Sequence, residues 1–545
     1  MASPLQRFYH WEMSTPDNPF LRQPVEGEWR QLSFHEAGME IRKIAAGLQS
    51  LGLPPGSRVA ILSKNCAHWI MADLAIWMAG YTSVPLYPTL SAHTIEAILT
   101  HCQAQVIFVG KLDGYGEQQS GIPAGTKRVS FPWYGIQEDT TWDQWKSTNP
   151  PLEGTPDLVP TEMATIMYTS GTTGVPKGVV ATFQSLGFVV ESALEKFKLI
   201  NTKERFFSYL PLSHIAERVL VEMGGLYTGS CINFSESLEK FPENLQAVQP
   251  TIFLAVPRIW AKFQEKLQQK IPDNRLRMLL RIPGIRNVLR NTIKRKLGLS
   301  RARWIFTGAA PISVGLLEWY DQLGIQIHEV YGMTENLAYS HINLHERRHG
   351  TVGKAWENVQ VRLADDGEIL IKHLGLMSGY YKEAQLTSEA FTPDGFLRTG
   401  DQGTISKDGF MTITGRVKDM FKTDKGKYIT PAPIEMQWAQ NLDVDQVCVV
   451  GMGIPQPIVL VTLSEAGRAK SREEVSRSIL HTLHQVNNGL EKYERITTAV
   501  VMKENWTVEN GLLTPTLKVR RIALEKVYVP MYPGWYHHGD VIVWE

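Results

Sequence analysis

The sequence of 545 residues predicts an α/β protein with a large N-terminal domain of layered α/β units and a small α+β domain at the C-terminus. Its composition, 43% hydrophobic and 20% charged, is that of a globular protein and excludes a disordered chain. In the first half, β-branched runs alternate with helical patterns, which predicts largely parallel sheets. After about residue 416, short strand-like runs separated by Asp and Gly turns indicate the smaller unit.

Local patterns predict the individual elements in order. Ser33-Phe-His-Glu36 has the form of a capping box, which predicts an amphipathic helix that extends to Leu51. The next expected elements are a strand over Arg58–Leu62, a helix over Trp69–Gly80 and a strand over Val106–Gly110. Toward the C-terminus, strands are expected over Gly367–Ile371, Gly409–Ile413 and Gln446–Val450.

Charge, cysteines and hydropathy narrow the class of protein. The formal net charge of +1 gives no bulk attraction to polyanions. The four cysteines show no zinc-binding spacing, so we expect buried thiols in a reducing compartment. The start of the chain lacks a secretory pattern. The apolar stretches Cys66–Val84 and Val447–Leu463 are both interrupted by polar residues, Gly or Pro, so neither is expected to span a membrane. We expect a cytoplasmic protein, with peripheral attachment to the inner membrane surface left open.

The strongest local motif is a loop rich in glycine and hydroxyl groups. It reads Tyr168-Thr-Ser-Gly-Thr-Thr-Gly-Val-Pro-Lys-Gly-Val-Val180 and follows an apolar run. Glycines let backbone N–H groups approach phosphate oxygens, hydroxyls add donors, and Lys177 adds positive charge. The spacing does not fit a Walker A loop, which argues against a phosphate-loop kinase.

This motif resembles the phosphate-binding signature of the adenylate-forming enzymes, which include acyl-CoA synthetases, luciferases and peptide-synthetase adenylation domains. The resemblance implies that the loop binds the phosphates of ATP. The residues concerned are Thr169, Ser170, Gly171, Thr172, Thr173, Gly174 and Lys177.

Further motifs of that family follow in order. Thr307-Gly-Ala-Ala-Pro311 and Tyr331-Gly-Met-Thr-Glu335 resemble its adenine and ATP elements. The resemblance implies that Tyr331 stacks on adenine, that Thr334 contacts the α-phosphate and that Glu335 holds Mg²⁺, because a carboxylate beside phosphates needs a bridging cation. The remaining nucleotide contacts implied by these two motifs are Gly308, Ala309, Ala310 and Gly332.

The last motifs concern the ribose, the hinge and the catalytic lysine. Arg398-Thr-Gly-Asp401 and Gly415-Arg416 resemble the elements in which Asp401 accepts hydrogen bonds from the ribose hydroxyls and Arg416 helps to hold the nucleotide. Lys418 matches the family's hinge residue, so the resemblance implies a large domain over 1–416 and a mobile small domain over 417–545. Gly426 matches the loop that lines the pantetheine tunnel of coenzyme A, with a solvated hairpin as the alternative. Lys518 matches the catalytic lysine, which suits a step that builds negative charge.

Two segments resemble the long-chain fatty acyl-CoA synthetases in particular. They are Pro211-Leu-Ser-His-Ile-Ala-Glu-Arg218 and Val256-Pro-Arg-Ile-Trp260. His214 is a candidate for the acyl or CoA site, although a buried structural histidine is the alternative. Some bacterial members carry a gating tryptophan about where Arg218 stands here, which leaves the gate of the acyl tunnel unidentified.

The resemblance covers nearly the whole chain and implies an ATP- and Mg²⁺-dependent ligase that joins a long- or medium-chain fatty acid to coenzyme A. Two alternatives remain: a fatty acyl-AMP ligase that loads a carrier protein, and a non-catalytic acyl or nucleotide sensor. The polar residues that catalysis needs are present, which argues against the sensor.

One region stands out by charge. From Arg258 to Arg303 the local net charge is +12, although the whole chain carries only +1. Within 275–299, apolar residues follow helical spacing after Pro283-Gly284, as in a basic amphipathic helix that contacts an anionic membrane or an acidic partner. The alternative is an apolar stripe that packs on the body of the protein. Nucleic acid is not expected as a partner because no aromatic residues interleave with these charges.

Overall fold

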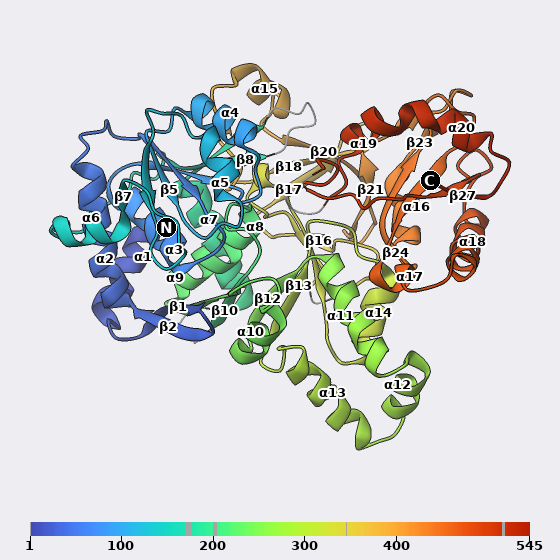
Figure 1. Cartoon of the computed structure of the whole chain (residues 1–545), viewed down its shortest axis with the longest axis horizontal. Helices are drawn as coiled ribbons and strands as arrows, with labels where there is room; N and C mark the ends of the chain where they lie inside the picture. The colour runs from blue at the N-terminus through green and yellow to red at the C-terminus, as the bar shows by residue number, and fades with distance from the viewer. Residues whose placement is uncertain (1, 170–175, 200–203, 345, 509, 515–517) are drawn as a thin grey trace.

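The computed structural model describes residues 2–169, 176–199, 204–344, 346–508, 510–514 and 518–545. Figure 1 shows a large N-terminal part and a smaller C-terminal part beside it, which confirms the predicted fold class. Helices and strands alternate through the first part of the chain, as predicted.

An eight-stranded sheet forms the centre of the large part. Its strand order is β19-β9-β8-β4-β3-β5-β6-β7, and the pairs from β8 through β4, β3, β5 and β6 to β7 are parallel. The strands are β3 (Arg58–Leu62), β4 (Thr82–Leu86), β5 (Val106–Val109), β6 (Lys127–Ser130), β7 (Thr140–Thr141), β8 (Met163–Thr169), β9 (Lys177–Thr182) and β19 (Gly379–Tyr380).

Helices pack against this sheet, and the first of them begins as predicted. Ser33 and Glu36 form the capping box of α2 (Phe34–Gln49). Every residue of α3 (Ala67–Met78) is buried, since the helix lies among α2, β1, β3 and β4. Further helices here are α1 (Pro4–Ser14), α4 (Ala92–Cys102), α5 (Tyr115–Gln118), α6 (Trp142–Thr148) and α7 (Phe183–Phe197).

Three smaller sheets complete the large part. The first has the order β10-β11-β1-β2, the second β12-β13-β14-β15-β16 and the third β17-β18-β20-β21. The strands of the first are β1 (Pro19–Val25), β2 (Glu28–Ser33), β10 (Arg205–Ser208) and β11 (Cys231–Phe234). Those of the second are β12 (Ile252–Ala255), β13 (Trp304–Thr307), β14 (His328–Tyr331), β15 (His341–Ile342) and β16 (Lys354–Ala355). Those of the third are β17 (Gln360–Leu363), β18 (Glu368–Lys372), β20 (Leu397–Ile405) and β21 (Met411–Arg416).

The helices between these strands include one π-helical turn. This turn, η2, covers Arg218–Met223. The others are α8 (Ile215–Glu217), α9 (Gly224–Thr228), α10 (Phe241–Val248), α11 (Pro257–Lys270), α12 (Asp273–Leu280), α13 (Ile285–Lys296), α14 (Val314–Gln322), the 3₁₀ turn η3 (Thr334–Asn336) and α15 (Ala384–Ala390).

The small part has its own sheet and its own apolar cores. The sheet has the order β24-β25-β26-β27, and a separate hairpin pairs β22 with β23. The strands are β22 (Phe421–Lys422), β23 (Tyr428–Ile429), β24 (Val444–Val450), β25 (Ile458–Leu463), β26 (Ala499–Val501) and β27 (Ile542–Trp544). The helices are α16 (Pro431–Trp438), α17 (Glu465–Arg468), α18 (Arg472–Asn488), α19 (Arg521–Tyr528) and α20 (Tyr532–Tyr536).

The two apolar stretches are interior segments of the fold. Cys66–Val84 forms α3 and part of β4, and Val447–Leu463 lies in the antiparallel pair β24–β25. Over the described residues, none of the helices is both long and apolar enough to cross a membrane. All four cysteines are free thiols, but Cys231 is only partly buried, which corrects the expectation that all four are buried. Its position in β11, at the start of the strand, leaves it nearer the surface.

The basic helix forms as α13, but its apolar stripe divides into two halves. Ile293 is buried, and Leu289 and Leu297 pack against the same core. Ile285 and Val288, at the start of the helix, remain exposed. The stripe therefore fastens one end of α13 to the body and leaves the other end uncovered.

Candidate active site

The candidate site begins where two parallel strands of the five-stranded sheet end. β13 ends at Thr307 and β14 ends at Tyr331, so their following loops meet at one edge of the sheet, where open α/β sheets bind ligands. A Cβ atom on Gly308 would lie 2.9 Å from the carbonyl oxygen of Val330, so this position requires glycine. Ala309 has φ +66, a left-handed conformation that is costly for alanine and is typical of functional loops.

Tyr331, Asp401 and Arg416 form a hydrogen-bonded cluster beside these loops. The Tyr331 hydroxyl donates to Asp401 Oδ2 at 2.7 Å, and Arg416 Nε donates to Asp401 Oδ1 at 2.9 Å. Strands β20 and β21 bring the two charges together because Asp401 and Arg416 are paired residues in their register. The carboxylate of Asp401 raises the pKa of Arg416. We call Tyr331, Asp401 and Arg416 the open cluster, since the Arg416 side chain is 51% exposed.

Lys518 of the small part lies within reach of the charges of the open cluster. Its side chain keeps exposed surface, yet the surrounding protein partly desolvates the ammonium and lowers its pKa to about 8. Arg416 also lowers this pKa, whereas Asp401 opposes the shift. His214 has a pKa lowered to about 4, first by burial and then by the positive charge of Lys518. Residues from both parts of the chain therefore meet at one site.

A buried carboxylate forms the second half of the site. Glu335 is buried in η3, and burial raises its pKa. The Tyr380 hydroxyl donates to Glu335 Oε1 at 2.9 Å, and Lys177 Nζ lies 5.3 Å from the centre of the Tyr380 ring. Thr334 precedes Glu335 in the same turn. The antiparallel pairing of β19 with β9 carries Tyr380 to this place.

These residues fit a magnesium ion. Mg²⁺ binds through one or two carboxylates together with substrate phosphates, and a nearby cation would stabilise the charged form that burial disfavours in Glu335. Among the residues with described positions, no group of three or more His, Cys, Asp or Glu could form an all-protein metal site. The Glu335 carboxylate therefore suits a magnesium ion that is bound together with the phosphates of a substrate.

The phosphate loop is described only at its ends. Thr169 and Lys177 are paired residues in the antiparallel register of β8 and β9. The predicted residues Ser170, Gly171, Thr172, Thr173 and Gly174 lie outside the described residues. Of the other predicted nucleotide residues, Gly332 packs so tightly that a Cβ there would lie 2.5 Å from the Ala338 carbonyl carbon. Ala310 is exposed.

Three predicted residues do not join this cluster. Lys418 is exposed in the turn after β21, at the junction of the two parts. Gly426 lies in the exposed β22–β23 hairpin with φ +77. Arg218 is fully buried in the core, where it contacts the carboxylates of Asp73 and Glu222. Their roles at the hinge, the CoA site and the acyl site remain predictions.

Two residues that hold the site in place, Tyr380 and Asn65, belong to none of the motifs that the sequence shows. Tyr380 follows Gly379 with no catalytic motif around it, and an aromatic pair after a glycine is the only local signal. Asn65 fixes the segment before His214, because its side chain donates to Ser208 Oγ at 2.8 Å and accepts from the Leu212 backbone at 2.9 Å. No short-range pattern connects Asn65 with residues that lie more than 140 positions later.

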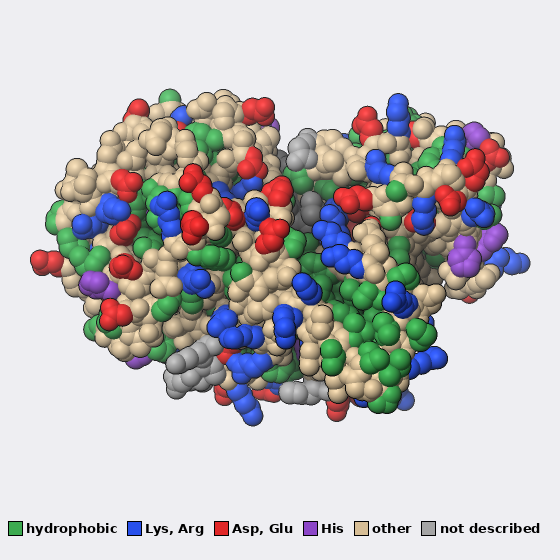
Figure 2. All heavy atoms as spheres, turned by 60° about the horizontal axis from the view of Figure 1, so that its bottom comes forward, with side chains coloured by type: hydrophobic (Ala, Val, Ile, Leu, Met, Phe, Trp, Pro, Cys, Tyr) green, Lys and Arg blue, Asp and Glu red, His purple; other side chains and the backbone are tan. Residues whose placement is uncertain are grey.

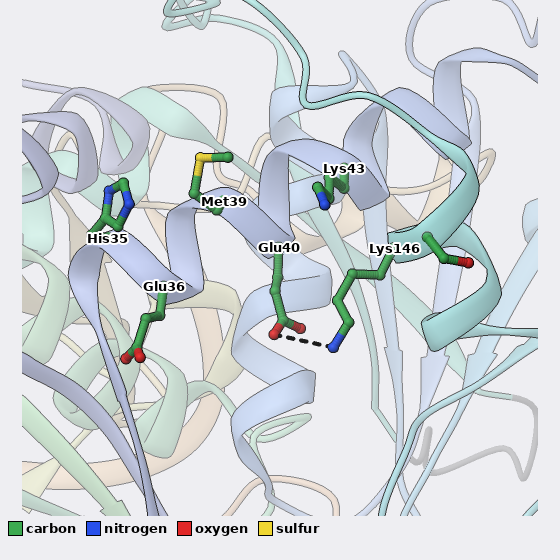
Figure 3. Close-up of a pocket in the computed structure, with 7 residues that line it drawn as sticks. His35, Glu36, Met39, Glu40, Lys43 and Lys146 are labelled. Carbon is green, nitrogen blue, oxygen red and sulfur yellow. Dashed lines mark hydrogen bonds and ion pairs between the residues drawn. The ribbon is translucent and has the colours of Figure 1, made fainter.

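A surface depression between α2 and α6 is lined by none of the predicted site residues (Figure 3). Its lining residues are His35, Glu36, Met39, Glu40, Lys43, Lys146 and Ser147. Glu40 and Lys146 form an ion pair of 3.4 Å across it, and Trp142 Nε1 donates to Glu40 at 3.0 Å. These contacts hold α6 against α2, so the depression arises from the packing of these two helices.

Comparisons with known proteins show the family of the chain. Family models match residues 8–381 as AMP-binding enzyme and residues 403–536 as AMP-binding enzyme C-terminal domain. The chain is 29% identical to the long-chain-fatty-acid–CoA ligase FadD15 of Mycobacterium bovis, over 94% of this chain and 93% of that protein. It is also 29% identical to the peroxisomal long chain acyl-CoA synthetase 6 of Arabidopsis thaliana, over 94% of this chain and 82% of that protein.

Solved structures share the fold at low identity. The A domain of carboxylic acid reductase from Segniliparus rugosus, in complex with AMP and a carboxylic acid, superposes with a TM-score of 0.81 at 19% identity, over 99% of this chain and 95% of that chain. O-succinylbenzoate coenzyme A synthetase from Bacillus subtilis gives 0.74 at 20% identity, over 95% of this chain and 98% of that chain. Because one family model alone matches more than half of the sequence, this chain belongs to the AMP-binding enzyme family.

Proposed function

We propose that this protein is a fatty-acid–CoA ligase that works in two steps. In the first step, a fatty acid carboxylate attacks the α-phosphate of ATP, the bond between the α-phosphate and the bridging oxygen breaks, and pyrophosphate leaves. In the second step, the thiol of coenzyme A attacks the acyl carbonyl, and AMP leaves as the thioester forms. The observation that carries the proposal is the hydrogen-bonded cluster of Tyr331, Asp401 and Arg416, with Lys518 of the small part near enough for the charges of Arg416 and Asp401 to act on its ammonium.

The open cluster and Lys518 have separate tasks in the first step. Asp401 already accepts from Tyr331 and Arg416, and its remaining lone pairs are free to accept ribose hydroxyls. Lys518, with a pKa of about 8, is mostly protonated at neutral pH, and its charge stabilises the negative charge that develops between carboxylate and phosphate. Glu335 would hold Mg²⁺ against the phosphates, where the ion would neutralise their charge, and Thr334 would contact the α-phosphate.

The second step needs a different arrangement of the small domain, because Gly426 now lies in an exposed hairpin. We assign the pivot to Lys418, in the exposed turn after β21, with the domains divided at 416/417. Lys418→Pro fixes φ near −65° and restricts rotation there. We expect pyrophosphate exchange to persist and thioester formation to fall much further. Equal loss of both activities in a folded protein would place the pivot elsewhere.

A long- or medium-chain fatty acid is the proposed substrate. The names of the ligases from Mycobacterium bovis and Arabidopsis thaliana support this class, as they cover nearly the whole chain. The test is a panel of acids from C2 to C22 with ATP and CoA, in which AMP and pyrophosphate are both followed. We expect AMP and acyl-CoA in equal amounts with long or medium chains. Pyrophosphate release with transfer only to a phosphopantetheinylated carrier protein would favour a fatty acyl-AMP ligase instead, and no release would favour a sensor.

We also propose that the enzyme binds anionic membrane through the segment 275–299, where a poorly soluble acid would collect. α12 and α13 protrude along the lower edge of the molecule in Figure 1. Met278, Ile282, Ile285 and Val288 are exposed around the turn that joins them, and Val288 has 68% of its surface exposed. Figure 2 shows hydrophobic side chains gathered on this face, with Lys and Arg around them. An exposed apolar group with basic flanks is typical of a membrane-surface element.

The basic side chains that remain available to an anionic bilayer lie near the turn between α12 and α13. Arg290 donates twice to the Gln322 carbonyl oxygen, so it already has a partner within the protein. Arg275, Arg281 and Arg286 are exposed, and between residues 274 and 303 the sequence holds no Asp or Glu. Each Lys or Arg near an anionic bilayer contributes about 1 kcal/mol, screened over roughly 8–10 Å at physiological salt. We therefore expect the enzyme to attach to anionic membrane weakly and in a salt-sensitive way.

Cosedimentation with liposomes tests this attachment. We expect binding that rises with anionic lipid content and falls at high salt. Arg281→Glu/Arg286→Glu should remove most of the binding, whereas Lys407→Glu/Lys503→Glu, an equal charge change at exposed residues elsewhere, should retain most of it. Equal loss in both pairs would indicate general charge attraction, and retention in both would exclude this segment as the contact.

A further inference from the structure

One ion pair joins the two parts of the chain away from the candidate site. Arg258 stands in the first turn of α11, in the large part, and Asp445 is the second residue of β24, in the small part. Arg258 Nη2 donates to Asp445 Oδ2 at 2.6 Å. The two side chains are only 30% and 20% exposed, so water screens this pair less than a pair on the open surface.

This pair is distinct from the other ion pairs of the molecule. Among residues whose positions are described, no other ion pair links a residue before the proposed boundary at 416/417 with one after it. The buried Arg258 Nε has no hydrogen-bond partner among those residues, so the contact with Asp445 is what orients the guanidinium. Figure 1 shows α11 beside β24, where the large and small parts meet.

We propose that Arg258 and Asp445 form a latch that holds the small domain in the orientation for adenylate formation. The proposal rests on the two-step function above. In the present orientation the ion pair between Arg258 and Asp445 is formed, and the charges of Arg416 and Asp401 act on the ammonium of Lys518. A rotation about Lys418 moves Asp445 relative to Arg258, so the ion pair must break before the thioester step. The pair therefore biases the equilibrium between the two orientations toward the first step.

A variant that removes one charge of the latch should shift the equilibrium between the two domain orientations and leave the candidate active site intact. Asp445→Asn keeps the shape of the side chain and removes its charge, and Arg258→Gln removes the opposite charge from the other domain with a shorter side chain. We expect pyrophosphate exchange to fall three- to tenfold, while thioester formation from preformed acyl-adenylate is unchanged or faster. The matched control is Asp408→Asn, which breaks an ion pair with Arg348 inside the large part and should change neither half-reaction.

Exchange of the charges provides a second test. In the double variant Arg258→Asp/Asp445→Arg the ion pair can form again with its charges exchanged. We therefore expect the ratio of pyrophosphate exchange to thioester formation to recover at least half of the loss seen in the single variants. Equal changes in both half-reactions in the two single variants would overturn the latch. A folded double variant in which the ratio of pyrophosphate exchange to thioester formation stays as low as in the single variants would also overturn it.

A direct measurement separates failure of the latch from failure of the proposed function. Spin labels at Lys407→Cys and Lys503→Cys, in a Cys231→Ser background, report the distance between the two domains. We expect Asp445→Asn to broaden or shift the distance distribution, whether or not CoA is the acceptor. An unchanged distribution in both single variants would overturn the latch, whereas absence of acyl-CoA product in the parent protein would overturn only the proposed function.

Discussion

Arg416 in the open cluster and Arg218 in the core both pair with carboxylates, but they differ in exposure. Arg416 contacts Asp401 and is 51% exposed. Arg218 is 0% exposed, contacts Asp73 and Glu222, and donates to Thr165 Oγ1 at 2.8 Å. We call Asp73, Arg218 and Glu222 the closed cluster.

The closed cluster has protein on every side. The Arg218 guanidinium lies 5.5 Å from the ring centre of Trp69 and 5.4 Å from that of Trp77. Burial and the charge of Asp73 raise the pKa of Glu222 well above its ordinary value. Similar side chains thus stand in different surroundings: the open cluster is accessible to a ligand, whereas the closed cluster is enclosed and links α3, β8 and η2.

The largest expected effect comes from breaking the closed cluster. Arg218→Met removes the cation and leaves buried carboxyl groups without it. We expect the free energy of unfolding to fall by about 3–5 kcal/mol in urea denaturation followed by tryptophan fluorescence. The variant Asp73→Leu/Arg218→Met/Glu222→Leu should recover most of that loss, because apolar groups can replace a buried ionic set. A loss below about 1 kcal/mol in the single variant would mean that the cluster is not structural.

The second-largest effect is expected from Lys518, which belongs to the small part and acts at the open cluster. Lys518→Ala should lower adenylate formation by about 10²–10³, because one preorganised donor of charge stabilisation is lost. Thioester formation from preformed acyl-adenylate and CoA should stay near the parent rate. The free energy of unfolding should hardly change, as the side chain keeps exposed surface. A similar loss in both half-reactions would remove Lys518 from the adenylation step.

A third change contrasts Arg416 directly with Arg218. Arg416→Gln removes a charge-assisted hydrogen bond to Asp401, which is worth about 1.5–3 kcal/mol, so kcat/KM for ATP should fall by roughly 10- to 150-fold. Stability should change by only about 1 kcal/mol or less, since the side chain is half exposed. Arg362→Gln, at an arginine of similar exposure that pairs with Asp394, is the control and should retain activity. Loss of stability without loss of activity would make Arg416 a structural residue like Arg218.

The smallest effect is a pH dependence. The pKa of Lys518 is lowered to about 8, so the lysine loses its proton as the pH rises through that value. The rate of adenylate formation should therefore fall roughly tenfold between about pH 7 and pH 9. The thioester half-reaction should not show this fall, because it does not use the charge of Lys518. A flat profile for adenylate formation would mean that the charge of this lysine is not needed.

Much of the local structure could be predicted from the sequence. The capping box at Ser33 and the strand Arg58–Leu62 match the structure, because both depend on residues close together in the chain. The motifs around Tyr331 and Asp401 could be found for the same reason. Tyr380 and Asn65 could not, since the residues that they contact are brought near by strand pairing and loop packing.

The sequence by itself determined the fold class, the order of the motifs and the charged segment that contains α13. Only the tertiary structure decided which arginine faces solvent, which half of the α13 stripe packs on the body, and that Arg258 meets Asp445. The physical reason is the range of the interactions. Backbone propensity and capping act over a few residues, whereas burial and ion pairing depend on segments that lie 145 positions apart for Asp73 and Arg218 and 187 apart for Arg258 and Asp445.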